Sequence, residues 1–148
     1  MKYLVGEKPQ GCIFCNKIAE DNDRENFVLY RGPKSCLMLN LYPYNSGHLM
    51  AIPYEHAPSL ESLEEDTLLE LMLLVRKSLT ALRKLMNPDG FNVGVNIGKA
   101  SGAGIDEHVH IHIVPRWEGD TNFMPVFAET RVVPELLHDT YDKLKAVL

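Results

Sequence analysis

Cysteine is scarce in this sequence, with three residues, Cys12, Cys15 and Cys36, among 148. So small and odd a number excludes a fold held together by a framework of disulfides. The sequence also lacks the run of about 20 apolar residues that a membrane-spanning helix requires, and its first residues contain no apolar stretch of signal-peptide length. We therefore expect a cytoplasmic protein with no membrane partner.

Basic residues are in the minority, since 15 Lys and Arg against 20 Asp and Glu give a net charge of −5. Broad nucleic-acid binding needs a basic face that neutralises phosphates, so no nucleic-acid partner is expected, and any anionic ligand must be held by a local site. The other proportions, 45% hydrophobic and 24% charged residues, are those of an ordinary globular protein. The length predicts a single domain over residues 1–148.

Short apolar or alternating runs predict a set of β-strands. Phe27–Arg31 and Cys36–Leu41 flank turn-forming residues and are expected to form a hairpin, with His48–Pro53 as a third strand. Phe91–Ile97 alternates apolar and polar residues, and Gly94 leaves a gap in its polar face. Such a gap often marks a place where a ligand approaches the backbone.

Two helices are predicted from apolar residues that repeat every three or four positions. The first follows a capping-box pattern at Ser62–Glu65 and ends at Asn87-Pro88. Its apolar stripe is Leu68, Met72, Val75, Leu79, Leu82 and Met86. The second begins at Pro134, and its stripe is Leu137, Tyr141, Leu144 and Leu148. One long helix and a C-terminal helix beside strands that are near neighbours in sequence predict an α+β fold with a mainly antiparallel sheet.

The segment HVHIHIV contains three of the six histidines of the chain, His108, His110 and His112, at alternate positions. Because side chains alternate across a strand, the three imidazoles should share one face while Val109 and Ile111 point into the core. Three histidines at perfect alternation indicate a functional row of imidazoles.

Two kinds of chemistry fit such a row. The imidazoles could bind zinc with an open coordination position that activates water. Alternatively, one imidazole could attack phosphorus as a nucleophile while its neighbours position the phosphate and handle protons. The small-residue loop Lys99–Gly104 can direct backbone N–H groups towards an anion, and Asn96 precedes it on the polar face of its strand. The loop therefore favours phosphate chemistry.

The sequence from His108 to Val114 resembles the histidine triad motif of the nucleotide hydrolases and transferases called the HIT superfamily. Other motifs match in order and spacing: Asn40 before Leu41-Tyr42-Pro43, Gly47-His48-Leu49-Met50, Pro53-x-x-His56 and Asn96-Ile97-Gly98. The segment 115–125 is similar to the microbial branch that includes diadenosine tetraphosphate phosphorylases. The resemblance covers nearly the whole chain and implies a HIT-like α+β fold and a homodimer.

The resemblance also implies roles for individual residues. His110 corresponds to the nucleophile that attacks the α-phosphorus of a nucleotide, and His112 and His48 would orient its ring and stabilise its charge. His108 completes the catalytic row. Asn40 falls where the family contacts the ribose, and Asn96 falls where a polar side chain holds phosphate oxygens.

One departure from the family concerns a polar pair, glutamine then serine or threonine, that often precedes the first histidine by four and three residues. This sequence has Gly104 and Ile105 there. The backbone N–H groups of residues 102–105, including Gly102 and Gly104, and the side chain of Ser101 must then contact the phosphate. Trp117 is expected either to stack on a base or to fill a dimer interface, and Arg116 either to meet distal phosphates or to be ion-paired.

The Cys12-x-x-Cys15 pair indicates metal or redox chemistry, although buried thiols are an alternative. Some HIT proteins bind zinc with two such cysteines and two histidines, and by that resemblance His56 and His108 complete the set. Four protein ligands leave no position for water, so this zinc would be structural. No organic cofactor is expected.

The function that the resemblance implies is cleavage of a dinucleoside polyphosphate through a nucleotidyl-histidine, which phosphate or water then resolves. A nucleoside phosphoramidase or adenylate-conjugate hydrolase is a second possibility that shares the intermediate. A nucleotide-binding sensor with little turnover is a third, because the polar pair before His108 is missing.

Overall fold

The computed structural model describes residues 11–41, 47–102, 107–120 and 134–148. Its centre is a sheet in the order β1-β2-β3-β5-β4, in which every pair of neighbours is antiparallel. The strands are β1 (Val28–Arg31), β2 (Ser35–Leu39), β3 (Leu49–Pro53), β4 (Gly90–Val95) and β5 (Ile111–Arg116). The predicted α+β class, the hairpin and the third strand are confirmed.

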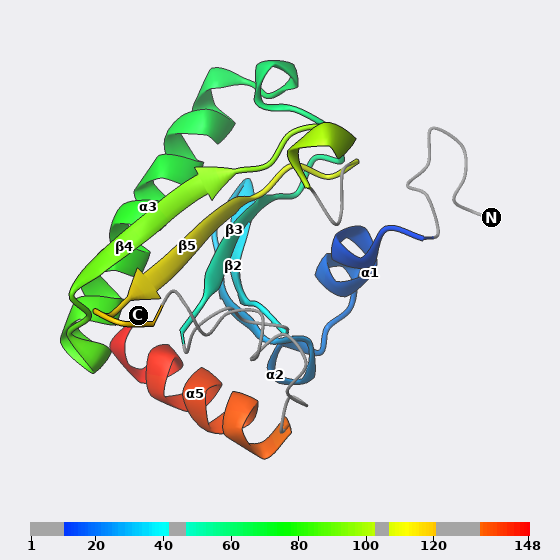
Figure 1. Ribbon diagram of the computed structural model, residues 1–148. Helices are drawn as coiled ribbons and strands as arrows, with labels where there is room; N and C mark the ends of the chain where they lie inside the picture. Colours follow the sequence, from blue (N-terminus) through cyan, green and yellow to red (C-terminus); the bar gives the residue numbers. More distant parts are fainter. Residues whose placement is uncertain (1–10, 42–46, 103–106, 121–133) are drawn as a thin grey trace.

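Helices cover both faces of this sheet. The long helix α3 (Glu65–Met86) and the C-terminal helix α5 (Pro134–Val147) lie on one side, and the short helix α1 (Ile13–Ala19) lies on the other (Figure 1). The one-turn helix α2 (Asp23–Asn26) and two 3-10 turns, Leu60–Ser62 and Lys99–Ser101, complete the elements. Within these described ranges, no helix has both the length and the apolarity to cross a bilayer.

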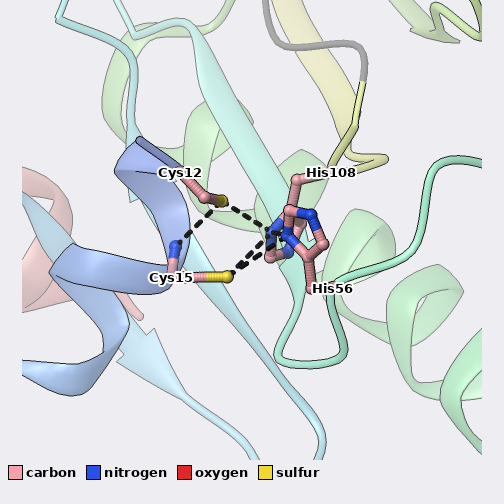
Figure 2. A group of neighbouring side chains, drawn as sticks. All are labelled: Cys12, Cys15, His56 and His108. Atoms are coloured by element: carbon pink, nitrogen blue, oxygen red, sulfur yellow. Dashed lines mark hydrogen bonds between the residues drawn. The ribbon is translucent and has the colours of Figure 1, made fainter. Parts of the chain in front are cut away.

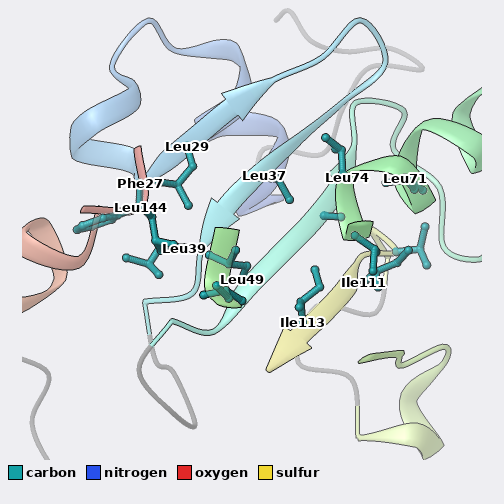
Figure 3. Packing of buried hydrophobic residues seen from close by; sticks show 14 of the residues in the cluster. Phe27, Leu29, Leu37, Leu39, Leu49, Leu71, Leu74, Ile111, Ile113 and Leu144 are labelled. Atoms are coloured by element: carbon teal, nitrogen blue, oxygen red, sulfur yellow. The ribbon is translucent and has the colours of Figure 1, made fainter. Parts of the chain in front are cut away.

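The alternation of side chains along the strands divides the core into two clusters. Leu37, Leu49 and Ile113 point towards α3 and pack with Leu71 and Leu74 of that helix (Figure 3). The residues between them in the strands point towards α1 and form a second cluster: Cys36, Met38, Met50 and Ile52, with Cys12, Phe14, Cys15 and Val28. Because successive residues of a strand face opposite sides, one sheet supports an apolar core on one face and a functional site on the other.

The beginning of α3 differs from the prediction. The capping box at Ser62 is wrong, because Ser62 lies in a 3-10 turn and Glu64 is the N-cap, without a side-chain hydrogen bond. Leu63 between them is extended and buried, so the chain remains non-helical until this side chain has entered the core. The end of the helix is as predicted, with Asn87 at a φ of 48° as the C-cap.

The buried face of α3 is also rotated relative to the predicted stripe. Met72 is 56% exposed. The buried residues of the helix are Thr67, Leu71, Leu74, Val75, Ser78, Ala81 and Leu82. Ser78 is tolerated in this face because its hydroxyl donates to the Leu74 carbonyl. A pattern of large apolar residues does not detect such small or internally bonded positions.

Candidate functional site

The row of histidines lies on the α1 side of the sheet. His112 is in β5, whereas His108 and His110 lie just before this strand, which begins later than predicted. Val109, Ile111 and Ile113 pack into the α3-side core. The alternation therefore directs all three imidazoles to the opposite face, as predicted.

His110 is held in one protonation state by its backbone surroundings. Its Nδ1 lies 2.9 Å from the carbonyl oxygen of His108, and since a carbonyl can only accept, Nδ1 carries the proton. Burial lowers the pKa of His110, against a smaller upward effect of this hydrogen bond, so the ring is neutral near pH 7. Nε2 then bears a lone pair, and no group in the described part of the chain hydrogen-bonds to it. Such a nitrogen is a nucleophile.

His48, which is buried, and His112, which is half-buried, form a pair beside this ring. Nε2 of His48 lies 2.9 Å from Nδ1 of His112, and the His112 ring is 4.7 Å from the His110 ring, centroid to centroid. Burial, and then the neighbouring imidazoles, lower the pKa of His48 to about 3 and that of His112 to about 4. Both rings are therefore neutral near pH 7, and one donates its N–H to the other. His48 is therefore hydrogen-bonded to His112, and the His112 ring contacts the His110 ring.

These lowered pKa values predict that acid destabilises the fold. A histidine of the unfolded chain titrates near pH 6.5, so unfolding takes up protons below that pH while folded His48 stays neutral down to about pH 3. The contribution is fully present above pH 6.5 and decreases as the pH falls. Between pH 7 and pH 5 we expect His48 to remove about 2 kcal/mol from the free energy of unfolding. Urea denaturation should show a smaller loss in His48→Asn than in the parent, and equal losses would contradict this assignment.

Open space lies beside the row, on β4. In the antiparallel register Gly94 is opposite His112 and Val95 is opposite Ile111, so the next pair would place Asn96 beside His110. A Cβ built on Gly94 would meet no atom within 4 Å. The predicted gap is thus present next to the imidazoles, with room for a ligand.

Three other residues that were predicted to contact the ligand, Asn40, Ser101 and Gly102, lie in the described part of the chain. The Asn40 amide nitrogen lies 3.3 Å from Nδ1 of His48 and 3.4 Å from its Nε2, at the end of the row. The Ser101 hydroxyl donates to the Gly98 carbonyl at 2.6 Å, within its own turn. Gly102 has a φ of 88°, a conformation that favours glycine. Gly104 lies outside the described residues.

The segment after β5 is held by an ion pair. Nη2 of Arg116 lies 2.7 Å from Oδ1 of Asp120, and Arg116 also donates to the Asn92 side chain. The backbone N–H of Trp117 donates to the Asp120 carboxylate at 3.0 Å, and its side chain is half-buried. Of the two predictions for Arg116, the ion pair is the one observed. Neither prediction for Trp117 is tested by these contacts.

Four side chains gather at the other end of the row, where α1 meets the segment before β5. Cys12 and Cys15 come from the start of α1, His56 from the loop after β3, and His108 from the row itself (Figure 2). Cys12 Sγ is 3.3 Å from Nδ1 of His108, and Cys15 Sγ is 3.3 Å from Nδ1 of His56. One ligand atom from each residue lies within 4.8 Å of all the others. We call this group the Cys/His cluster.

The spacing and protonation of the Cys/His cluster fit a tetrahedral metal ion. Zinc with Zn–S of about 2.3 Å and Zn–N of about 2.0 Å sets its ligand atoms roughly 3.3–3.8 Å apart. Nδ1 of His56 and Nδ1 of His108 are 3.2 Å apart. Nε2 of His108 donates to the Pro53 carbonyl at 2.8 Å, which leaves a lone pair on its Nδ1. A cation between these donors would stabilise their close approach.

Sequence reasoning missed one residue of the site, Phe14. Its ring is buried and contacts two histidines edge-on, with centroid distances of 4.8 Å to His110 and 5.5 Å to His108. Its position between Cys12 and Cys15 was a signal, but not a sufficient one, because Ile13 shares that position and is 41% exposed.

Comparisons with known proteins agree with this geometry. The model of the HIT domain family matches residues 21–119. A protein of Mycobacterium tuberculosis named AP-4-A phosphorylase is 43% identical over 124 residues, which are 84% of this chain and 64% of that protein. A protein of Schizosaccharomyces pombe named adenosine 5′-monophosphoramidase is 33% identical over 105 residues, which are 71% of this chain and 74% of that protein.

Solved structures agree as well. The crystal structure of a Zn-bound histidine triad family protein from Mycobacterium smegmatis has a TM-score of 0.74 and 25% identity, covering 93% of this chain and 92% of that one. The chain spans about 64% of the length of the M. tuberculosis relative, so the extents of the two proteins differ. The family model includes the whole histidine row and His48, and the chain belongs to the HIT domain family.

Proposed function

We propose that this chain is a nucleotidyl hydrolase or transferase that cleaves dinucleoside polyphosphates at the α-phosphorus, through a covalent nucleotidyl-histidine on His110. The observation that carries the proposal is the state of the His110 ring, whose Nδ1–H is held by the His108 carbonyl and whose Nε2 bears the lone pair. The names of the M. tuberculosis and S. pombe relatives, an AP-4-A phosphorylase and a phosphoramidase, support nucleotide substrates.

The reaction takes place in two displacements. In the first, the Nε2 lone pair of His110 forms a bond to the α-phosphorus, and the bond from that phosphorus to the bridging oxygen breaks, with its electron pair leaving on the polyphosphate. In the second, an oxygen of phosphate or water attacks the phosphorus, and the P–N bond breaks back to Nε2. Where water is the acceptor, its proton is released to the solvent. The Nδ1 proton stays on the ring throughout, where the His108 carbonyl stabilises the positive charge that develops.

Neighbouring residues have supporting roles in this proposal. His112 contacts the His110 ring and is steadied by its hydrogen bond with His48. Gly94, which leaves open space, is opposite His112, and Asn96 follows two residues later, so we assign the phosphate oxygens to this region. Asn40 would contact the ribose, the turn at Ser101 and Gly102 with Gly104 the phosphates, and Trp117 a base.

The acceptor distinguishes a phosphorylase from a hydrolase. The protein is incubated with diadenosine tetraphosphate, with and without inorganic phosphate, and the products are separated by chromatography. We expect ADP and ATP in the presence of phosphate, because the transferred AMP group becomes ADP. AMP and ATP in its absence would identify water as an acceptor. Two molecules of ADP formed without phosphate would contradict attack at the α-phosphorus. The absence of any product in both incubations would contradict the proposed turnover.

A phosphoramidase is the second candidate, favoured by the S. pombe relative. An amine needs a different leaving-group environment from a polyphosphate, because it must gain a proton as it leaves. A higher kcat/KM for adenosine 5′-phosphoramidate than for diadenosine tetraphosphate would favour this candidate.

We also propose that the Cys/His cluster binds a structural zinc ion. When bound, the ion would fix the four side chains in one tetrahedron, and with four protein ligands it would have no position for substrate. The fit of the donor atoms and the Zn-bound structural relative support this proposal. None of the three cysteines is in a disulfide, which supports our proposal of the reducing cytoplasm as the location of the protein.

A homodimer is a further part of this proposal. β4 is at the edge of the sheet, and Arg83 of α3 lies over the Phe91 ring of β4, so helix and edge strand are neighbours. Apolar side chains are exposed on these two elements and just after β4: Leu69, Met72, Leu73, Val93 and Ile97. An exposed edge with apolar side chains beside it is suited to pairing with a second copy of the chain.

Light scattering tests the dimer. The parent should have twice the mass of the chain, and the double variant Leu69→Glu, Met72→Glu should have the mass of a monomer, because two charges would be buried without partners. Leu136→Glu is the matched control, since Leu136 is an exposed leucine of α5, and it should remain dimeric. A monomeric parent, or a dimeric double variant, would contradict this interface.

A further inference from the structure

The Cys/His cluster and the His110 ring are connected by direct contacts. We infer that the cluster positions the His110 ring through two groups, Phe14 and the His108 carbonyl. These groups hold the ring in the orientation and tautomer in which Nε2 carries the lone pair and faces the substrate. Phe14 is thus a positioning residue for the nucleophile. This inference rests on the proposed role of His110, and it adds a task for the cluster besides stabilising the fold.

The first connection is the peptide unit between His108 and Val109. Its carbonyl accepts the Nδ1 proton of His110 at 2.9 Å, and its N–H donates to the Ala57 carbonyl at 2.7 Å. Ala57 directly follows His56, a member of the cluster. The side chain of His108 is a second member and is anchored at Nε2 by Pro53. The acceptor for His110 is therefore fixed at both ends by residues of the cluster or next to it.

The second connection is α1. A helix of seven residues is marginal by itself, so its position depends on tertiary contacts. At its start the Cys12 thiol accepts the Cys15 N–H at 3.3 Å, and both thiols face the cluster. At its end Arg31 donates to the carbonyls of Ile18 and Glu20, at 3.0 and 3.1 Å. The cluster thus determines where the first turn of α1 lies.

Phe14 connects the first turn of α1 to the His110 ring. It stands between the two cysteines, and its ring meets the His110 ring edge-on, at 4.8 Å and 69°. The His112 ring meets His110 in a similar way, at 4.7 Å and 66°. A ring with two such neighbours and one hydrogen bond has few alternative rotamers. Without Phe14, or without a fixed first turn of α1, His110 can rotate away from the His108 carbonyl and exchange its Nδ1 proton for one on Nε2.

A measurement of the tautomer tests this without any turnover. Protein labelled with ¹⁵N at histidine is examined by long-range ¹H–¹⁵N correlation at one pH, first loaded with zinc and then treated with a chelator. We expect His110 to be more than 90% in the Nδ1–H form with zinc and a mixture of both tautomers without it. His138 on α5 lies outside the site and should give the same signals in both samples. Identical His110 tautomers with and without zinc would overturn the inference.

A pair of variants separates positioning from structure. Phe14→Leu removes the ring against His110, and Phe27→Leu is the matched control, because Phe27 is also buried and lies 4.7 Å from a histidine ring, that of His138. We expect Phe14→Leu to lower kcat about tenfold with KM within twofold, and to shift His110 towards the mixed tautomers. Phe27→Leu should change neither.

Two other outcomes would count against Phe14. A rise in KM alone would make Phe14 a ligand contact, and an unchanged tautomer would make it merely part of the core. If no substrate is turned over by any form of the protein, the proposed function fails, whereas the tautomer measurement still decides whether the cluster orients His110.

Discussion

A His110→Gly variant should lose about 10⁴-fold in kcat while it remains folded. The substitution removes the nucleophile, and loss of a nucleophile removes most of the rate that covalent catalysis provides. His110 lies outside the helices and strands, so the backbone cost of glycine is at most about 1 kcal/mol. Initial rates with diadenosine tetraphosphate and phosphate, beside a thermal denaturation curve, check both parts of the prediction.

The matched control is His138→Ala, which removes a histidine on α5 that packs on Phe27 rather than in the row. It should retain the parent rate. The assignment of His110 as the nucleophile would be lost if His110→Gly turned over substrate as fast as the parent, or if both variants lost activity equally.

Removal of the metal should have the largest effect on stability. Purified protein should contain one zinc ion per chain, and a chelator should lower the midpoint of thermal unfolding by on the order of 10 °C. The estimate follows from binding to the folded state alone, which is worth about 4 kcal/mol when free zinc is a thousandfold above its Kd. Metal analysis and calorimetry of the same sample measure the two quantities.

The chain contains its own control for this experiment. Cys15→Ser removes one ligand and should abolish stoichiometric zinc, whereas Cys36→Ala removes a buried thiol outside the cluster and should retain one zinc ion per chain. Zinc bound equally by both variants would contradict the proposed ligand set. So would an unchanged thermal midpoint after complete removal of the metal.

The common face of the histidine row could be predicted because it depends on local geometry alone. Alternation along an extended segment holds whether His108 and His110 lie inside β5 or just before it, so the error in the strand boundary did not affect the result. The gap at Gly94 was predictable for the same reason.

Contacts across the chain could not be predicted from periodicity. The hydrogen bond between His48 and His112 joins residues 64 positions apart and depends on the register that pairs Met50 with His112. The meeting of His56 with Cys15 likewise requires the fold, and in the sequence only the family resemblance indicated it. Phe14 was overlooked because an aromatic residue in a short amphipathic helix has the same pattern as any core residue.

The buried face of α3 could not be predicted for a different reason. Met72 fits the helical repeat but is exposed, whereas Thr67 and Ser78 interrupt the repeat and are buried. Burial follows from how the whole helix is rotated against the sheet, and hydroxyl groups bonded within the helix cost little there.

Mass spectrometry of the quenched reaction would detect the proposed bond between Nε2 of His110 and the α-phosphorus of a nucleotide. The protein is mixed with diadenosine tetraphosphate in the absence of phosphate, stopped in alkali and digested. We predict an adenylyl group on the peptide that contains His110, with fragments that place it on this residue, and its disappearance when phosphate is added before quenching. An adenylyl group on His112 or His48, or turnover during which no adduct forms on any histidine, would contradict the account.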